Sequence, residues 1–187
     1  GQKNTALGYS NLSSNTSGGF NTAVGRSAMN ANTTGSYNVA VGAEALAVQT
    51  TDSNNTAVGY GALNANVQTN NTAVGYNALA NNTTGANNCA FGASTLDACT
   101  TGENNNAFGY IALGKSTTAV RNNAFGKSAG QEVTTGSNNT LIGHDSGGNV
   151  STGSENAFVG RSSGVAVTTG ARNTLIGCEA EVSDGDA

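Results

Sequence analysis

Charged residues are scarce in this chain, and their scarcity excludes several classes of protein. Only 10% of the residues are charged, and the formal net charge at pH 7 is −4. A protein that binds nucleic acid or an anionic lipid surface through its charge needs a patch of Lys and Arg side chains. The whole chain has only 7 such residues. We therefore expect no nucleic-acid partner.

Large apolar residues are also few. Leu, Ile, Val and Phe make up about a sixth of the chain, below the roughly 20% that a conventional core uses. Disorder would also require a high net charge, which is absent. No run of about 18 apolar residues occurs, so we expect no membrane insertion by this segment. The chain must fold around a thin core or share a core with its neighbours.

Residues that carry out catalysis or bind metals are sparse as well. His144 is the only histidine, and no Cys or carboxylate cluster accompanies it at metal-ligand spacing. We interpret the adjacent Asp145 as a solvated loop residue. No phosphate loop or dinucleotide-binding motif is present, and no acids cluster in a way that suggests a groove. We predict no catalytic residue, no metal and no cofactor, and hence a protein that is not an enzyme.

The cysteines leave one question open. There are 3 of them, Cys89, Cys99 and Cys178, so at least one stays unpaired within a monomer. Cys89 and Cys99 could form a disulfide if their Cα atoms come within about 7 Å. Alternatively, Cys89 is a small substitute at a strand position that usually holds Thr.

What the chain does have is a repeat. Gly is abundant at 27 residues, Pro is absent, and Asn and Thr dominate the polar residues. The motif Asn-x-Ala-Val-Gly, with conservative changes, occurs in eleven copies that follow one another at 17 residues, or once at 16. The motif begins at Asn4, Asn21, Asn38, Asn55, Asn71, Asn88, Asn105, Asn122, Asn139, Asn156 and Asn173. A fixed period of this kind is typical of a solenoid in which each repeat forms one coil.

One repeat, such as 71–87, divides into three parts. The Asn-Thr-Ala-Val-Gly segment alternates around apolar and β-branched residues and predicts a short strand. The Ala-Leu pair, as at 78–79, suggests a second short strand. The Thr-Thr-Gly segment, as at 83–85, predicts a turn in which Gly supplies a positive φ. The fold class is therefore all-β: a parallel β-solenoid of about eleven coils over residues 1–177.

Stacked coils bring equivalent residues into rows. Strands about 4.8 Å apart give a rod roughly 50 Å long. The motif Asn forms one such row, in which side-chain amides can bond along the axis. The motif Gly marks a strained backbone or a close approach of another backbone. We propose the Asn row as a structural ladder.

Variation between copies indicates which positions share the core. Two residues before the motif Gly, the first eight copies carry Ala and the last three carry Leu141, Phe158 and Leu175. Four residues after it, copies eight to ten replace Leu or Met by Gly130, Gly147 and Gly164. The residue four positions after the motif Gly becomes smaller along the chain as the residue two positions before it becomes larger. A close-packed interior of fixed volume requires this, so both positions are expected to face one core.

Two exposed rows are candidates for ligand binding. The first comprises Tyr9, Tyr60, Tyr76 and Tyr110, where spaced aromatic rings could contact sugars or a host protein. The alternative for this row is a packing belt between chains. The second is the Thr-Thr row of the turns, which could match ordered water in ice. Its alternative is simple turn formation. Asn-x-Ser/Thr triplets in the same turns are interpreted as turn chemistry rather than glycan sites.

The Asn-Thr-Ala-Val-Gly, Ala-Leu and Thr-Thr-Gly segments, as at 21–25 and 71–85, resemble in their order the head repeats of YadA-type trimeric autotransporter adhesins. The repeat is also similar to the Asn-Thr-Ala-Val-Gly-Tyr repeats of phage-type tail-fibre proteins. The resemblance covers nearly the whole chain, although the period is longer than in the YadA type. It implies a left-handed β-roll, a homotrimer and a place outside the cell, on a cell or virion surface.

These observations lead to a function and an alternative. We expect a structural or adhesive shaft or head segment of a homotrimeric fibre, which attaches to a host-surface protein or glycan. The alternative is a monomeric solenoid that binds ice or a carbohydrate lattice through its Thr or Tyr face. The chain opens at Gly1 inside a partial repeat, so we expect a segment of a longer protein. Residues 178–187 are acidic and are expected to cap the solenoid or to begin the next segment.

Overall fold

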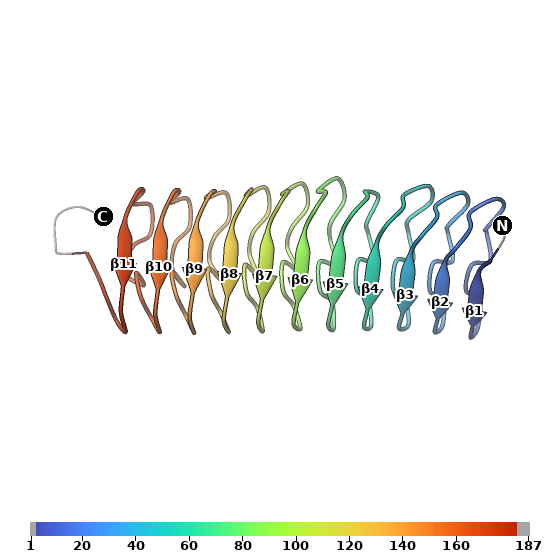
Figure 1. Cartoon of the computed structure of the whole chain (residues 1–187), viewed down its shortest axis with the longest axis horizontal. Coiled ribbons are helices and arrows are strands. Elements are labelled where there is room, and N and C mark those ends of the chain that lie inside the picture. The colour runs from blue at the N-terminus through green and yellow to red at the C-terminus, as the bar shows by residue number, and fades with distance from the viewer. Residues whose placement is uncertain (1–2, 183–187) are drawn as a thin grey trace.

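A computed structural model of the chain describes residues 3–182 and contains one parallel β-solenoid (Figure 1). Eleven strands of three residues form a single sheet in which each strand pairs with the next in the chain. They are β1 (Thr5–Leu7), β2 (Thr22–Val24), β3 (Val39–Val41), β4 (Thr56–Val58), β5 (Thr72–Val74), β6 (Cys89–Phe91), β7 (Asn106–Phe108), β8 (Asn123–Phe125), β9 (Thr140–Ile142), β10 (Ala157–Val159) and β11 (Thr174–Ile176). The described residues include no helix. The predicted fold class is confirmed.

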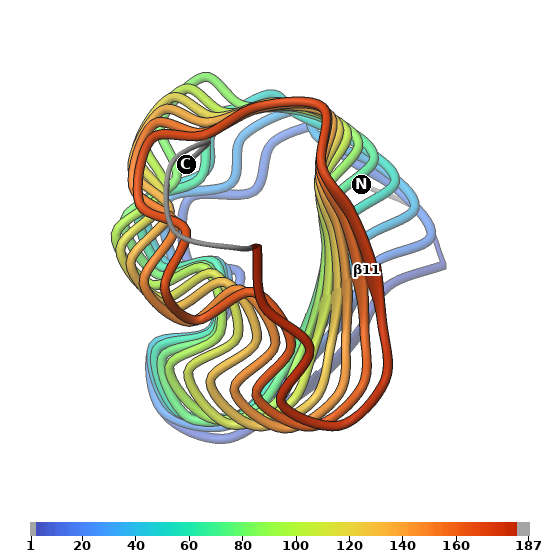
Figure 2. The ribbon, with the colours of Figure 1, turned by 90° about the vertical axis from the view of Figure 1, so that its left-hand side faces the viewer.

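The strands pair in register, so each motif position meets its equivalent in the next coil. Ala40 is paired with Ala23 on one side and with Ala57 on the other. The 16-residue repeat does not disturb this register, because Thr56 still pairs with Thr72 and the shortening is absorbed in the turn. Viewed along the rod, the strands superimpose on one side of the coil and the turns form the other sides (Figure 2).

Each strand has one inward and two outward residues. In β2 to β9 the central residue is buried and its neighbours are partly or largely exposed. Successive side chains of a strand point to opposite faces, so the Ala of Thr-Ala-Val enters the core and Thr and Val face outward. The small core follows directly from this pattern, because Ala is the residue that most coils place inside.

The prediction of a second strand at Ala-Leu is wrong. Ala45 and Leu46 are both fully buried, which one strand with an outer face cannot achieve, since its side chains alternate. Leu46 instead adopts a left-handed conformation with φ of 50° and lies within a turn. Its N–H still donates to the carbonyl of Ala62 in the next coil at 3.1 Å. The coil thus bends sharply while both side chains enter the core.

The expected role of the turn glycine also needs correction. Gly35 of Thr-Thr-Gly does not have a positive φ; that conformation occurs two residues later, at Tyr37, with φ of 60°. Gly35 is required for space instead, because a Cβ there would lie 2.3 Å from the carbonyl oxygen of Asp52. The motif glycines that are followed by another coil combine both constraints. Gly42 has φ of 139°, and a Cβ on it would lie 2.3 Å from the carbonyl oxygen of Gly59.

The predicted exchange of volume between two core positions is confirmed. Leu141 and Phe158 are fully buried and occupy the room that Leu or Met fills in earlier coils. A Cβ on Gly147 would lie 2.7 Å from Cδ2 of Leu141, and one on Gly164 would lie 2.4 Å from Cδ2 of Phe158. The large residue and the glycine therefore face the same part of the core.

This compensation leads to a prediction about stability. Phe158→Ala should lower the free energy of unfolding by about 3–5 kcal/mol, because it opens a cavity beside Gly164. Adding Gly164→Leu recreates the Ala and Leu combination of the earlier coils. It should recover part of the loss, with a coupling of about 0.5–3 kcal/mol. Denaturant unfolding of the two single variants and the double variant measures this coupling, and strictly additive effects would contradict the shared core.

Candidate functional site

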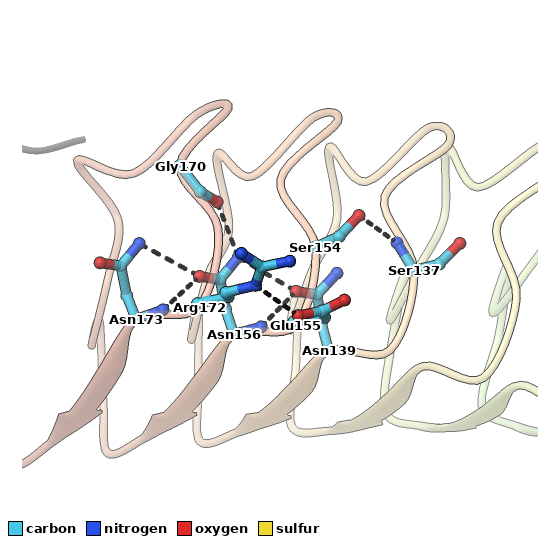
Figure 3. Close-up of polar contacts among 8 residues, drawn as sticks. All are labelled: Ser137, Asn139, Ser154, Glu155, Asn156, Gly170, Arg172 and Asn173. Carbon is cyan, nitrogen blue, oxygen red and sulfur yellow. Dashed lines mark hydrogen bonds and ion pairs between the residues drawn. The ribbon is translucent and has the colours of Figure 1, made fainter.

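The motif Asn side chains form a buried ladder along the rod. The N–H of Asn156 donates to Oδ1 of Asn139 at 3.0 Å, and its Nδ2 donates to the same oxygen at 3.1 Å and to the carbonyl of Gly170 at 2.9 Å (Figure 3). The backbone bond recurs at every step from Asn21 to Asn173. Each Asn ties its own turn to its strand and to the neighbouring coil. The ladder is a structural element and presents no ligand surface.

A second buried polar row was missed in the sequence. Seven residues after the motif Gly, the first coils place Asn15, Asn32, Gln49, Asn66 and Asn82. Later coils place Cys99, Ser116, Val133, Val150 and Val167 at this position. Four of the five amide residues, all but Asn15, are fully buried. The side chain at this position therefore changes from an amide in the first coils to an apolar group in the last coils.

This row includes the Asn of the turn triplets that begin at Asn32 and Asn82. Nδ2 of Asn32 donates to Oδ1 of Asn15 at 2.9 Å and to the carbonyl of Gly35 at 3.1 Å. Asn82 is equally buried and donates to the carbonyl of Gly85 at 2.7 Å. A buried amide cannot accept a glycan in the folded protein. The sequence signal for this buried row was the Asn that precedes Thr-Thr in the turn, as at Asn32 and Asn82.

The structure brings together only two of the four predicted Tyr residues. Tyr60 and Tyr76 are stacked, with ring centroids 5.7 Å apart and planes inclined by 14°. Arg26, Ala43 and Ala93 interrupt the row. Tyr9 and Tyr110 are also exposed, but they lie in other coils. The row is therefore one aromatic pair with outlying members rather than a continuous face.

Another aromatic pair lies in a different row. Phe20 and Tyr37 stack with centroids 4.9 Å apart, and Nζ of Lys3 lies 5.0 Å from the centroid of the Phe20 ring. These residues directly precede the motif Asn. Sequence reasoning missed them because most copies carry a polar residue at this position.

The Thr-Thr turns form two rows with different roles. In the first row, Oγ1 of Thr83 donates to the carbonyl of Thr100 at 3.0 Å, and Oγ1 of Thr100 donates to that of Thr117 at 3.2 Å. These hydroxyls bond to backbone carbonyls of the neighbouring coils. The second row, which includes Thr84 and Thr101, is exposed. The first row supports the interpretation of these residues as turn-forming.

A long apolar row lies on the outer face of the sheet. The third residue of each strand forms a row that we call the outer stripe. It consists of Leu7, Val24, Val41, Val58, Val74, Phe91, Phe108, Phe125, Ile142, Val159 and Ile176. Every member is apolar and at least partly exposed: Phe125 and Ile142 are exposed to 40% and 39%, and only Leu7 and Ile176, in the two end strands, reach 67% and 75%. The signal for it was present in the sequence, since an inward Ala leaves the following Val outside.

Beside the outer stripe runs the row of first strand residues, which we call the flanking row. Its members are Thr5, Thr22, Val39, Thr56, Thr72, Cys89, Asn106, Asn123, Thr140, Ala157 and Thr174. Neither row contains a charged residue. The outer sheet face is therefore neutral along its whole described length, in a chain whose net charge is −4.

The residues considered for catalysis or metal binding are His144, Asp145 and the three cysteines. His144 is exposed and Asp145 is half-buried. Within residues 3–182, no group of three or more His, Cys, Asp or Glu side chains could hold a metal ion. All three cysteines are free, so the possible Cys89–Cys99 disulfide is not formed. Burial raises the pKa of the Cys99 thiol to about 11, which keeps it protonated and unreactive at neutral pH.

The ion pairs of the described residues connect neighbouring coils. They are Arg26–Glu44, Lys115–Glu132, Arg161–Glu179 and Arg172–Glu155. All are largely exposed, so each contributes little to stability. Of the acidic tail, Glu179 takes part in one of these pairs, whereas Asp184 and Asp186 lie outside the described residues.

Comparisons with family models, with curated proteins and with solved structures gave no match. No helix long and apolar enough to cross a membrane occurs in residues 3–182.

The Asn ladder leads to a second prediction, which concerns stability. Asn122→Ala should lower the free energy of unfolding by about 1–3 kcal/mol, because it leaves the buried N–H of Asn139 and the carbonyl of Gly136 without their side-chain partner. Thr135→Ala, at an exposed position of the turn, should change stability by less than about 0.5 kcal/mol. Chemical denaturation of both variants tests this. Equal effects would mean that the ladder adds no more than an ordinary surface residue.

Proposed function

We propose that this chain is a non-catalytic structural or adhesive segment of a homotrimeric fibre that mediates attachment at a cell or virion surface. The observation that carries the proposal is the outer stripe, an uninterrupted apolar row on the face of a rod. A monomeric protein rarely leaves a long apolar surface exposed. Burial of this row against other copies would remove it from water and add to a core that is mostly Ala and Leu.

The repeat of the stripe favours a second copy of this chain as the partner. Apolar side chains recur once per coil, and neighbouring rings of the stripe lie 4.8–4.9 Å apart. A partner that contacts every coil must present groups with the same spacing, and another copy of the chain does so. The neutral face also brings no like charges together on self-association. A closed trimer agrees with the resemblance to YadA-type repeats, and the left-handed coil implied by that resemblance stays a prediction.

Adhesion would use the surfaces that remain outside such an assembly. The Tyr60–Tyr76 pair, together with Tyr9 and Tyr110, offers exposed aromatic rings for a host-surface protein or a glycan. Three parallel copies would multiply each weak contact through avidity. The sparse titratable groups support the proposal that the segment has no catalytic role.

The mass in solution tests the proposal directly. Light scattering on a size-exclusion column should give the mass of three chains. Val74→Asp places a charge on the outer stripe and should shift the mass towards one chain, because burial of an unpaired carboxylate is costly. Thr84→Asp, on an exposed turn, is the matched control and should keep the mass of the unmodified protein. A monomeric unmodified chain would overturn the trimer.

The alternative is a monomeric solenoid that binds ice or a carbohydrate lattice. The first Thr row argues against ice binding through the Thr face, because its hydroxyls already donate to backbone carbonyls. An ice-binding protein slows ice growth in dilute solution, whereas a fibre segment should show no thermal hysteresis. A measured hysteresis that is lost in Thr84→Val and Thr101→Val variants would favour the alternative.

A further inference from the structure

The outer stripe changes its character over three adjacent coils. Val occupies the stripe from β2 to β5, whereas Phe91, Phe108 and Phe125 occupy it from β6 to β8. The three rings are stacked nearly parallel, with centroids 4.9 Å and 4.8 Å apart and planes inclined by 3° and 7°. Ile, Val and Ile follow in β9 to β11. The stripe thus has one bulky segment, which we call the Phe segment.

The flanking row changes over the same coils. Thr72 in β5 and Thr140 in β9 enclose Cys89, Asn106 and Asn123. Nδ2 of Asn106 donates to Oδ1 of Asn123 at 2.9 Å, so Oδ1 of Asn106 and Nδ2 of Asn123 are not used by the bond between them. Bulky rings and amides therefore occur together at one level of the rod, and neither occurs elsewhere on the outer sheet face between residues 3 and 182.

We propose that the Phe segment sets the axial register of associated parallel copies. The proposal rests on the trimer proposed above. A strictly periodic stripe cannot define one alignment, because a slide by one coil again places apolar residues opposite each other. A unique segment removes this degeneracy. The same reasoning applies to coiled coils, in which a single buried Asn selects one alignment of otherwise equivalent repeats.

Misaligned copies would pack less well than aligned ones. In a parallel arrangement shifted by one coil, Phe91 would face Val74 and Phe125 would face Ile142. Each mismatch leaves a gap or forces the faces apart, and either loses packing contacts. In an antiparallel arrangement aligned end to end, β7 would face β5 and β8 would face β4. Phe108 would then meet Val74, and Phe125 would meet Val58. Of the parallel arrangements, only the unshifted one places all three Phe residues opposite Phe. An antiparallel arrangement does so only when it is shifted by two coils, which leaves two coils of each copy without a partner.

The alignment can be read from cysteine pairs on the stripe. We would prepare two chains, one with Ile142→Cys and the other with Ile176→Cys, both in a Cys89→Ser and Cys178→Ser background. Cys99 is buried and stays. Positions 142 and 176 lie two coils, or roughly 10 Å, apart along the rod, whereas a disulfide forms only if two Cα atoms lie within about 7 Å. In mixed assemblies, disulfides between identical positions therefore report aligned copies, and disulfides between the two positions report a two-coil shift.

The decisive variant replaces all three Phe residues by Val, the residue that the stripe carries in β2 to β5, so the fold should be retained. With Phe present, identical-position disulfides should exceed mixed ones by about tenfold or more. In the Val variant, the two kinds should become comparable. Moving the bulky segment, by adding Val24→Phe, Val41→Phe and Val58→Phe to the Val variant, should restore the excess of identical-position disulfides.

The outcomes separate the two proposals. A trimeric mass with comparable disulfides while Phe is present would overturn the role of the Phe segment and leave the trimer intact. A trimeric Val variant that keeps the full excess would also overturn it. A monomeric mass of the unmodified chain would overturn the trimer and, with it, the proposed alignment.

Discussion

The hydrogen bonds between successive coils are the interaction on which the rest of the molecule depends. The N–H of Gly25 donates to the carbonyl of Leu7 at 2.8 Å, and the N–H of Gly42 donates to that of Val24 at the same distance. Each coil is too short to satisfy its own backbone, so it relies on the coils on both sides. This close approach leaves no space for a side chain at the motif Gly, as the 2.3 Å between a Cβ on Gly42 and the oxygen of Gly59 indicates. The fixed period of the sequence follows from this requirement.

The interior adapts to the fixed coil size by exchanging volume between positions. The coil cannot widen without breaking the ladder of bonds, so a larger residue such as Phe158 must be matched by a glycine, here Gly164. The same constraint explains the left-handed conformation of Leu residues such as Leu46, which is otherwise uncommon. Bonds to both neighbouring coils and burial of two consecutive side chains stabilise a backbone that an isolated peptide would avoid. Local conformation is therefore determined by the stack rather than by the propensity of each residue.

The sequence predicted the features that depend on period and volume. Eleven copies of one motif indicated the solenoid, and the replacement of Leu by Gly130 alongside the appearance of Leu141 indicated a shared core position. It failed where the backbone departs from common conformations. The Ala-Leu pairs, such as Ala78-Leu79, predict a strand because the left-handed conformation of Leu79 has no signal at that residue such as Gly or Asn. Gly35 was assigned a positive φ because close backbone contacts between coils are not visible in a single repeat.

The outer sheet face was overlooked although its signal was present. The exchange of Ala for Leu141 and Phe158 assigns the central strand residue to the core, and an inward Ala23 requires that Val24 points outward. Once that orientation is known, the sheet has a row of small residues on its inner side, beside which turn residues such as Leu46 and Leu63 are buried, and a row of larger apolar residues on its outer side. Within the strands, this distribution reverses the usual arrangement of a soluble domain, in which the larger side chains are inside. The proposed association of copies accounts for this distribution, because it would bury the larger residues of the outer row between chains. The inner Ala row would then keep the outer row straight and evenly spaced.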